Sequence, residues 1–158
     1  MPPQQDAAAP PFEGLYCDGE TFRTRSLDDI AGDRGTVLVF GGFVFSAVAT
    51  NWWTRYENAG WANFEDVTVV GVHRDGPYAV NAFLRSDDRP FAIFADIEGS
   101  IAAAYDLLEH RDGMAGVRTA RRAIYVVNAD RRITDSWVAT DWISPAPRSR
   151  IEAAVASL

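Results

Sequence analysis

The strongest constraint on the fold comes from three short, continuous runs of apolar residues. They cover residues 36–43 (TVLVFGGF), 67–73 (VTVVGVH) and 123–128 (AIYVVN), and each is rich in β-branched side chains. A run in which neighbouring residues are all apolar is typical of a strand that is buried on both faces. We therefore expect a central sheet that is covered by helices on both sides.

The segments between these runs have helical and turn signals. A helix is expected at residues 49–59, because Gly60 stops it, and a second one up to about residue 85, because Asp75-Gly76-Pro77 supplies a turn and a proline for its first turn. Ser26 and Asp29 form a capping box for a short helical turn. The remaining expected elements are a strand at 91–95, a helix at 100–108, an antiparallel strand at 133–138 and a closing helix at 147–157.

A βαβ crossover followed by a hairpin and a terminal helix predicts an α/β protein with a thioredoxin-like fold, a central mixed sheet flanked by helices. The length of 158 residues fits one domain, which we expect over residues 12–158. Residues 1–11 are rich in Pro, Gln and Ala without a hydrophobic period, which predicts a disordered tail. Sites in α/β proteins lie at the carboxyl ends of parallel strands, so the loop at residues 41–49 is the first candidate.

The charge of the chain limits its partners. It has 22 acidic and 15 basic residues, all 15 of them arginine, for a net charge of −7. Such a field repels nucleic acids and anionic lipid surfaces, so neither is an expected partner. Abundant Asp without lysine indicates adaptation to a saline cytoplasm, with a biased base composition as the alternative. No run approaches the roughly 20 apolar residues of a membrane span, so we expect a cytoplasmic protein.

The single cysteine, Cys17, excludes an internal disulfide and a cysteine-rich metal site. We predict no metal and no cofactor. The residues that could suggest a metal site have no ligand spacing, and we interpret them as solvated or hydrogen-bonded side chains. They are His73, Asp75, Asp96 and His110.

Several segments, in the same order along the chain, resemble the peroxiredoxins, the alkyl hydroperoxide reductase and thiol-specific antioxidant family. The resemblance covers residues 12–158 and is carried by TFRTRSLDDIAGDRGTVLVF, FVFSAVAT, VTVVGVHRD, RPFAIFAD, AAAYDLL and RRAIYVVNADRRITDSW. It implies a thioredoxin-like fold of the peroxiredoxin type. In that family a cysteine thiolate at a helix N-terminus attacks peroxide, while a hydroxyl, backbone N–H groups and an arginine hold the peroxide oxygens.

The family pattern is Pro, three residues, Thr or Ser, two residues, then the peroxidatic cysteine. Ser46 takes the hydroxyl position, Thr50 the position after the cysteine and Arg122 that of the arginine. Gly42 stands in place of the proline, and Ala49 in place of the cysteine. An acidic residue common three positions later is Trp52 here.

Two explanations of Ala49 stay open: replacement of the cysteine alone, or a loss of catalysis after which the neighbours changed too. The changes at Gly42 and Trp52 favour the second. Of the adjacent arginines, Arg121 and Arg122, only one can face the Ser46 loop, because successive strand residues point to opposite faces. The resemblance assigns that place to Arg122, where it could bind an anion.

Three functional hypotheses follow. The first is a peroxiredoxin-like pseudoenzyme whose pocket binds a small anionic or peroxide-like ligand, with a second copy of the chain as a candidate partner; its residues are Gly42, Ser46, Ala49, Thr50, Trp52 and Arg122. The second is an inactivated form of a thiol peroxidase that reduces hydrogen peroxide or alkyl hydroperoxides. The third is redox activity through Cys17, although the adjacent Asp18 would raise the pKa of that thiol.

Aromatic residues crowd one expected helix and its exit. Trp52 and Tyr56 lie one turn apart, with Trp53 beside them and Trp61 after the helix. Such a cluster can be explained equally well by core packing or by a place in an interface or a ligand pocket.

Overall fold

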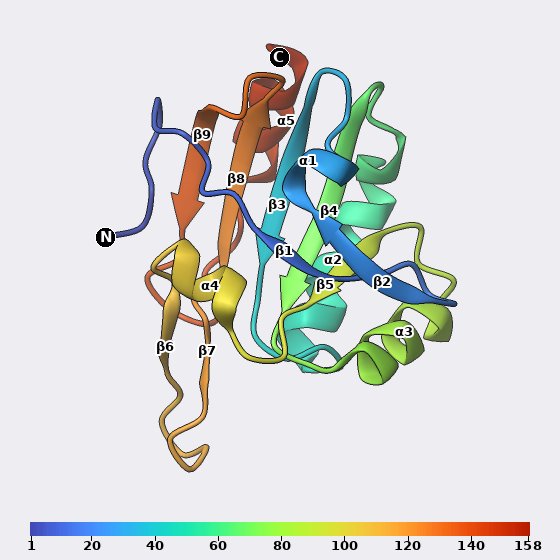
Figure 1. The fold of residues 1–158 in the computed structure, drawn as a ribbon, viewed down its shortest axis with the longest axis vertical. Coiled ribbons are helices and arrows are strands. Elements are labelled where there is room, and N and C mark those ends of the chain that lie inside the picture. Colours follow the sequence, from blue (N-terminus) through green and yellow to red (C-terminus); the bar gives the residue numbers. More distant parts are fainter.

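A seven-stranded sheet forms the centre of the structure, a computed structural model that describes all 158 residues. Its strands are β1 (Glu13–Cys17), β2 (Phe22–Ser26), β3 (Gly35–Phe40), β4 (Val67–His73), β5 (Ala92–Ala95), β8 (Ala123–Asn128) and β9 (Ile133–Val138). They lie in the order β2-β1-β5-β4-β3-β8-β9, with β3, β4 and β5 parallel and the other neighbours antiparallel (Figure 1). The expected mixed sheet of an α/β protein is confirmed.

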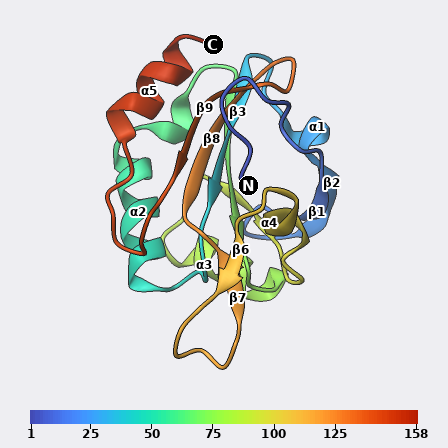
Figure 2. The ribbon, with the colours of Figure 1, turned by 90° about the vertical axis from the view of Figure 1, so that its left-hand side faces the viewer.

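Helices cover both faces of the sheet. They are α1 (Leu27–Ile30), α2 (Ala47–Asn58), α3 (Pro77–Ser86), α4 (Ser100–Ala104) and α5 (Arg148–Ala156), and a 3-10 turn spans Trp61–Asn63. Figure 2 shows the sheet nearly edge-on, with α2 and α5 on one side and α1 and α4 on the other. No helix has both the length and the apolar character needed to span a membrane.

Two separate hydrophobic cores explain why the central strands are apolar on both faces. In β3, Val37 and Val39 pack with α2, α3 and α5, whereas Leu38 and Phe40 pack in the core on the opposite face. The side chains of a strand alternate between its faces, so a strand between two cores carries no polar face. The continuous apolar runs of the sequence follow from this position.

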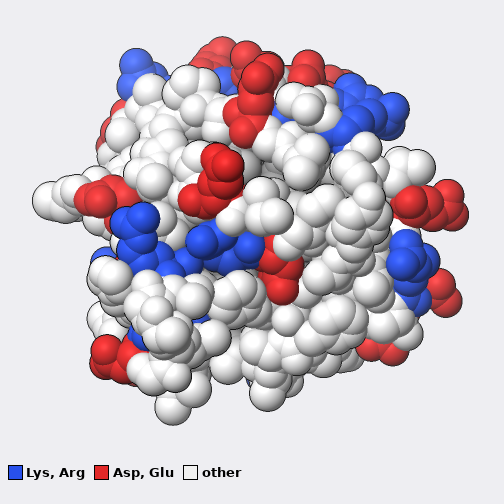
Figure 3. Space-filling model, turned by 60° about the horizontal axis from the view of Figure 1, so that its bottom comes forward, with Lys and Arg blue, Asp and Glu red and all other residues white.

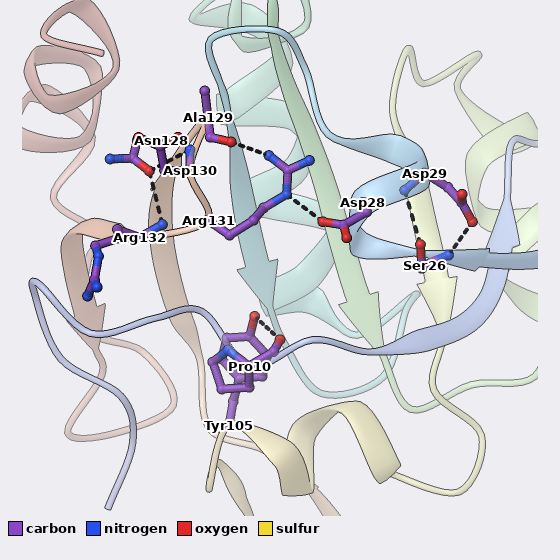
Figure 4. Close-up of polar contacts among 10 residues, drawn as sticks. All are labelled: Pro10, Ser26, Asp28, Asp29, Tyr105, Asn128, Ala129, Asp130, Arg131 and Arg132. Carbon is purple, nitrogen blue, oxygen red and sulfur yellow. Dashed lines mark hydrogen bonds and ion pairs between the residues drawn. The ribbon is translucent and has the colours of Figure 1, made fainter.

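The capping box at Ser26 is present. The Ser26 hydroxyl accepts a hydrogen bond from the N–H of Asp29, and the Asp29 carboxylate accepts one from the N–H of Ser26 (Figure 4). The next carboxylate, Asp28, pairs with Arg131 at 2.7 Å between Nε and Oδ1. These contacts join the start of α1 to the turn that links β8 and β9.

Residues 6–10 lie along that same turn, whereas the sequence predicted a disordered tail over residues 1–11. The N–H of Asp6 donates to the carbonyl of Ile133, and the N–H of Ala9 donates to that of Arg131, both at 2.8 Å. The hydroxyl of Tyr105 donates to the carbonyl of Pro10 at 2.9 Å (Figure 4). β9 is an edge strand with unpaired backbone groups, and these bind a neighbouring backbone whatever its side chains are.

The predicted helix at residues 100–108 is wrong beyond Ala104. Asp106 has a left-handed backbone with φ of 52°, and the chain then enters a separate hairpin of β6 (Leu108–His110) and β7 (Arg118–Ala120). Strand pairing here overrides the helix propensity of the sequence. The β1–β2 hairpin was not anticipated either, because β2 is short, polar and largely exposed.

Candidate functional site

The loop between β3 and α2 is held in place by the end of β4. The N–H of Val44 donates to the Asp75 carboxylate at 2.8 Å, and burial raises the pKa of that carboxyl group. At Gly41 a side chain would meet His73, since a Cβ there would lie 2.6 Å from its Cε1. Phe45 completes the loop with a left-handed backbone at φ of 64°. The loop is thus fixed before α2 begins.

His73 uses both ring nitrogens for this purpose. Its Nε2 accepts the indole N–H of Trp53 at 2.9 Å, so the ring proton resides on Nδ1, which donates to the carbonyl of Gly42 at 3.0 Å. Burial lowers the pKa of His73 to about 4. The histidine is therefore a neutral positioning residue that ties α2 and the loop to β4.

The N-terminus of α2 opens onto a cavity of about 130 Å³. Ser46 is the N-cap, and its hydroxyl accepts the N–H of Ala49 at 3.2 Å. Ala49 is 8% exposed in the first turn of α2, and it lines the cavity together with Ser46 and Gly42. Figure 1 shows this end of α2 beside the ends of β3 and β4, at the lower edge of the sheet.

Arg122 enters the same cavity from the residue before β8 and is only 6% exposed. Its Nη1 donates to the carbonyl of Ser144 at 2.6 Å, and no carboxylate lies within ion-pair distance. Its guanidinium carbon lies 5.5 Å from the ring centre of Trp52 and 5.4 Å from that of Trp137. Desolvation lowers the pKa of Arg122, so its charge is held at a cost that a bound anion would offset.

The sequence also matches a known protein family. The family model described as "AhpC/TSA family" matches residues 6–136, which is most of the chain. This chain belongs to the AhpC/TSA family. No curated protein matches it by sequence.

Solved structures of several other proteins share the fold. The reduced 2-Cys peroxiredoxin of Plasmodium vivax has 19% sequence identity and a TM-score of 0.79, over 97% of this chain and 81% of that chain. The peroxidoxin BcpB of Mycobacterium tuberculosis has 18% identity and a TM-score of 0.78, over 98% and 95%. Thioredoxin peroxidase I of Plasmodium yoelii has 22% identity and a TM-score of 0.75, over 98% and 90%. At these identities the likeness establishes the peroxiredoxin type of thioredoxin-like fold.

The aromatic cluster of α2 and its exit belongs to the core of this AhpC/TSA-family fold, and part of it also lines the cavity. All four residues are buried, with Tyr56 stacked on Trp61 at 4.2 Å between ring centres. Trp52, Trp53 and Tyr56 also line the cavity. They form core on one side and a pocket wall on the other, and none supplies an exposed interface.

A second arginine at the cavity was not anticipated from the sequence. Arg111 follows β6, its guanidinium lies 3.5 Å from the ring centre of Trp142, and its Nη1 donates to the Thr119 hydroxyl at 3.3 Å. A side chain at Gly42 would displace the end of Arg111, because a Cβ there would lie 2.9 Å from Nη1. Only the pairing of β6 with β7 brings Arg111 to this place.

Arginine side chains gather on this end of the molecule. Figure 3 views it from below, and every blue atom there belongs to an arginine, since the chain has no lysine. Acidic side chains lie beside them, but the cavity itself is lined by arginines and by no carboxylate. The charged side chains in the cavity wall are therefore all positive, although the protein as a whole is negative.

Two proposed residues are not part of the cavity. Thr50 follows Ala49 on α2 but does not line it. Cys17 ends β1, is fully buried, and its Sγ lies 3.6 Å from the carbonyl oxygen of Leu15. Burial, together with the adjacent Asp18, raises the pKa of this thiol to about 11.

The four residues considered as metal ligands have other partners. His73 and Asp75 hold the loop, and Asp96 accepts the N–H groups of Ile101 and Ala102 at the start of α4. His110 lies at the end of β6, with its Nδ1 3.2 Å from the carbonyl oxygen of Gly116. No group of three or more His, Cys, Asp or Glu residues is arranged to hold a metal ion.

Proposed function

We propose that this AhpC/TSA-family protein has no thiol peroxidase activity and that its cavity binds a small ligand with an anionic group. The observation that carries the proposal is that Ala49 and Arg122 line the same cavity. Ala49, in the first turn of α2, contributes only a methyl group to the cavity wall. The guanidinium of Arg122 in the same wall is buried and forms no ion pair with a carboxylate.

The chemistry supports the absence of turnover. A peroxidatic cysteine attacks the O–O bond with a thiolate, and a methyl group has no electron pair to donate. The only thiol of the chain, Cys17, is fully buried with a pKa raised to about 11, so it is almost entirely protonated at neutral pH. We expect no nucleophile at the cavity.

Peroxide consumption tests this part of the proposal. Purified protein with dithiothreitol and hydrogen peroxide or an alkyl hydroperoxide should consume peroxide no faster than dithiothreitol alone. Turnover that survives Cys17→Ala would overturn the proposal, because it would require a different nucleophile. Turnover abolished by Cys17→Ala would instead establish the redox hypothesis for Cys17.

A second candidate is an inactivated thiol peroxidase, and the retention of Ser46 and Arg122 at the cavity favours it. The variant Ala49→Cys separates the two. Rapid peroxide reduction by Ala49→Cys would mean that only the nucleophile is missing. A slow reaction would mean that the changes at Gly42 and Trp52 also removed catalysis, which is the result we expect.

Homodimer formation, a cytoplasmic location and adaptation to salt stay predictions of the sequence. Sedimentation velocity tests the first, and thermal unfolding at low and high salt tests the last. A salt-adapted protein should be more stable to heat in about 2 M KCl than in dilute buffer, because its net charge of −7 is screened there.

A further inference from the structure

We infer that the cavity binds an amphiphilic monocarboxylate, a molecule with one carboxylate on an apolar body about the size of a six-membered ring. The inference rests on the proposed function, since it names the ligand class of the same cavity. It is carried by three features of the wall: one buried guanidinium without a carboxylate partner, a mainly apolar lining, and a volume that suits a single ring. The other arginine of the wall, Arg111, is partly exposed and stacks on Trp142.

The guanidinium of Arg122 defines the charged end of the ligand. An arginine has five N–H donors, and the carbonyl of Ser144 accepts from one nitrogen, Nη1, at 2.6 Å. The contacts with Trp52 and Trp137 involve ring faces and use no N–H group. Arg122 can therefore offer a planar edge of donors, which matches the two oxygens of a carboxylate.

The nearest candidate for an internal partner is already engaged. Asp141 accepts hydrogen bonds from the N–H and the hydroxyl of Ser144, both at 2.6 Å, and from the N–H of Ile143 at 2.9 Å. It shapes the turn that presents the Ser144 carbonyl to Arg122, and it forms no ion pair with the guanidinium. Those three bonds all use Oδ1 of Asp141, and its charge acts on Arg122 through space without direct contact. A carboxylate in direct contact with Arg122 would therefore be that of a ligand.

The rest of the wall requires an apolar body. Twelve of the eighteen lining residues are hydrophobic, among them Trp52, Trp53 and Trp137. The volume of about 130 Å³ is close to that of an apolar cavity known to hold benzene, about 150 Å³. A small inorganic anion would leave this surface unfilled, and a polyanion would meet the negative field of the protein.

Binding of simple probes tests the inference. Quenching of tryptophan fluorescence and titration calorimetry on the intact protein would compare cyclohexanecarboxylate with cyclohexanecarboxamide, acetate and inorganic phosphate. We expect a Kd for cyclohexanecarboxylate of about 10 µM to 1 mM. The amide should bind at least about tenfold more weakly, because it loses a charge-assisted pair, and acetate likewise, because it loses the apolar body.

Two variants and one matched control locate the site. Arg122→Gln should weaken cyclohexanecarboxylate at least about tenfold and change the amide by less than about threefold. Arg121→Gln, on the neighbouring residue that does not line the cavity, should leave both affinities unchanged. Ala49→Leu should abolish binding of both probes, because its side chain fills the cavity, and it covers the case in which Arg122→Gln fails to fold.

Three outcomes would overturn the inference. They are equal affinity for acid and amide, tighter binding of phosphate than of cyclohexanecarboxylate, and binding that Ala49→Leu does not affect. If acid and amide bind equally and Ala49→Leu abolishes both, the cavity is still a ligand site, but the preference for a carboxylate is wrong. Peroxide turnover by the unaltered protein would contradict the proposed function by a separate measurement.

Discussion

Ala49 and Cys17 are two small, buried side chains of the same hydrophobic core, and their surroundings are opposite in electrostatic character. Ala49 lies in the first turn of α2, whose unpaired N–H groups carry partial positive charge, and lines the cavity that Arg122 enters. Cys17 lies in a sheet, next to Asp18, with its pKa raised to about 11. The only thiol of the chain therefore lies where its thiolate form is disfavoured. At Ala49, where a thiolate would be stabilised, the chain has a methyl group.

The largest expected effect is on thiol reactivity. In a Cys17→Ala background, Ala49→Cys should react with iodoacetamide at pH 7.5 at least about 1,000-fold faster than the thiol of the unaltered protein. The introduced thiol would ionise more readily, and Cys17 must await an opening of the core. Mass spectrometry over time measures both rates. Comparable rates would mean that the helix N-terminus and Arg122 do not stabilise a thiolate.

Acid should destabilise the Ala49 region through His73. Its pKa of about 4 in the folded protein is below the usual 6.5, so the unfolded chain binds more protons between these values. Stability is full above pH 6.5 and falls as the pH drops towards 4, by on the order of 3 kcal/mol. Urea unfolding at a series of pH values measures this loss. His73→Gln should flatten the slope, whereas His110→Gln, on the exposed hairpin, should retain it.

Serine substitutions at Cys17 and at Ala49 test how well each position tolerates a polar atom. Cys17→Ser should lower the free energy of unfolding by about 1–3 kcal/mol, because it buries a hydroxyl in the core. Ala49→Ser should cost less than about 1 kcal/mol, because its hydroxyl can reach the cavity. Denaturant unfolding measures both, with Cys17→Ala as the control for lost volume. Equal costs would show that the cavity offers no polar environment.

The smallest effect is expected at Thr50. It is adjacent to Ala49 in the sequence but does not line the cavity. Thr50→Ala should change the stability by less than about 0.5 kcal/mol, and the affinity for cyclohexanecarboxylate by less than about twofold. A larger loss of affinity would extend the site beyond the residues that line the cavity.

Much of the fold could be predicted from the sequence. The elements that could not be predicted are those whose side chains carry no clear pattern of burial. β3, β4 and β8 lie between two cores, so their apolar runs identify them without ambiguity. β2 is polar and exposed, and its pairing with β1 depends on backbone hydrogen bonds that leave no pattern in the side chains. The end of α4 was misplaced because good helix formers continue past the residue where the β6–β7 hairpin takes over.

The sequence was enough to indicate the α/β class and the family resemblance, and it shows the single cysteine and the alanine at residue 49. These depend on residue identity and on local periodicity, which a linear pattern contains. Only the folded chain shows that Arg122 forms no ion pair with a carboxylate and that Cys17 lies in the core. It also shows that Arg111 lines the cavity and that Thr50 does not. Burial and charge pairing depend on residues far apart in the chain, so no local pattern could predict them.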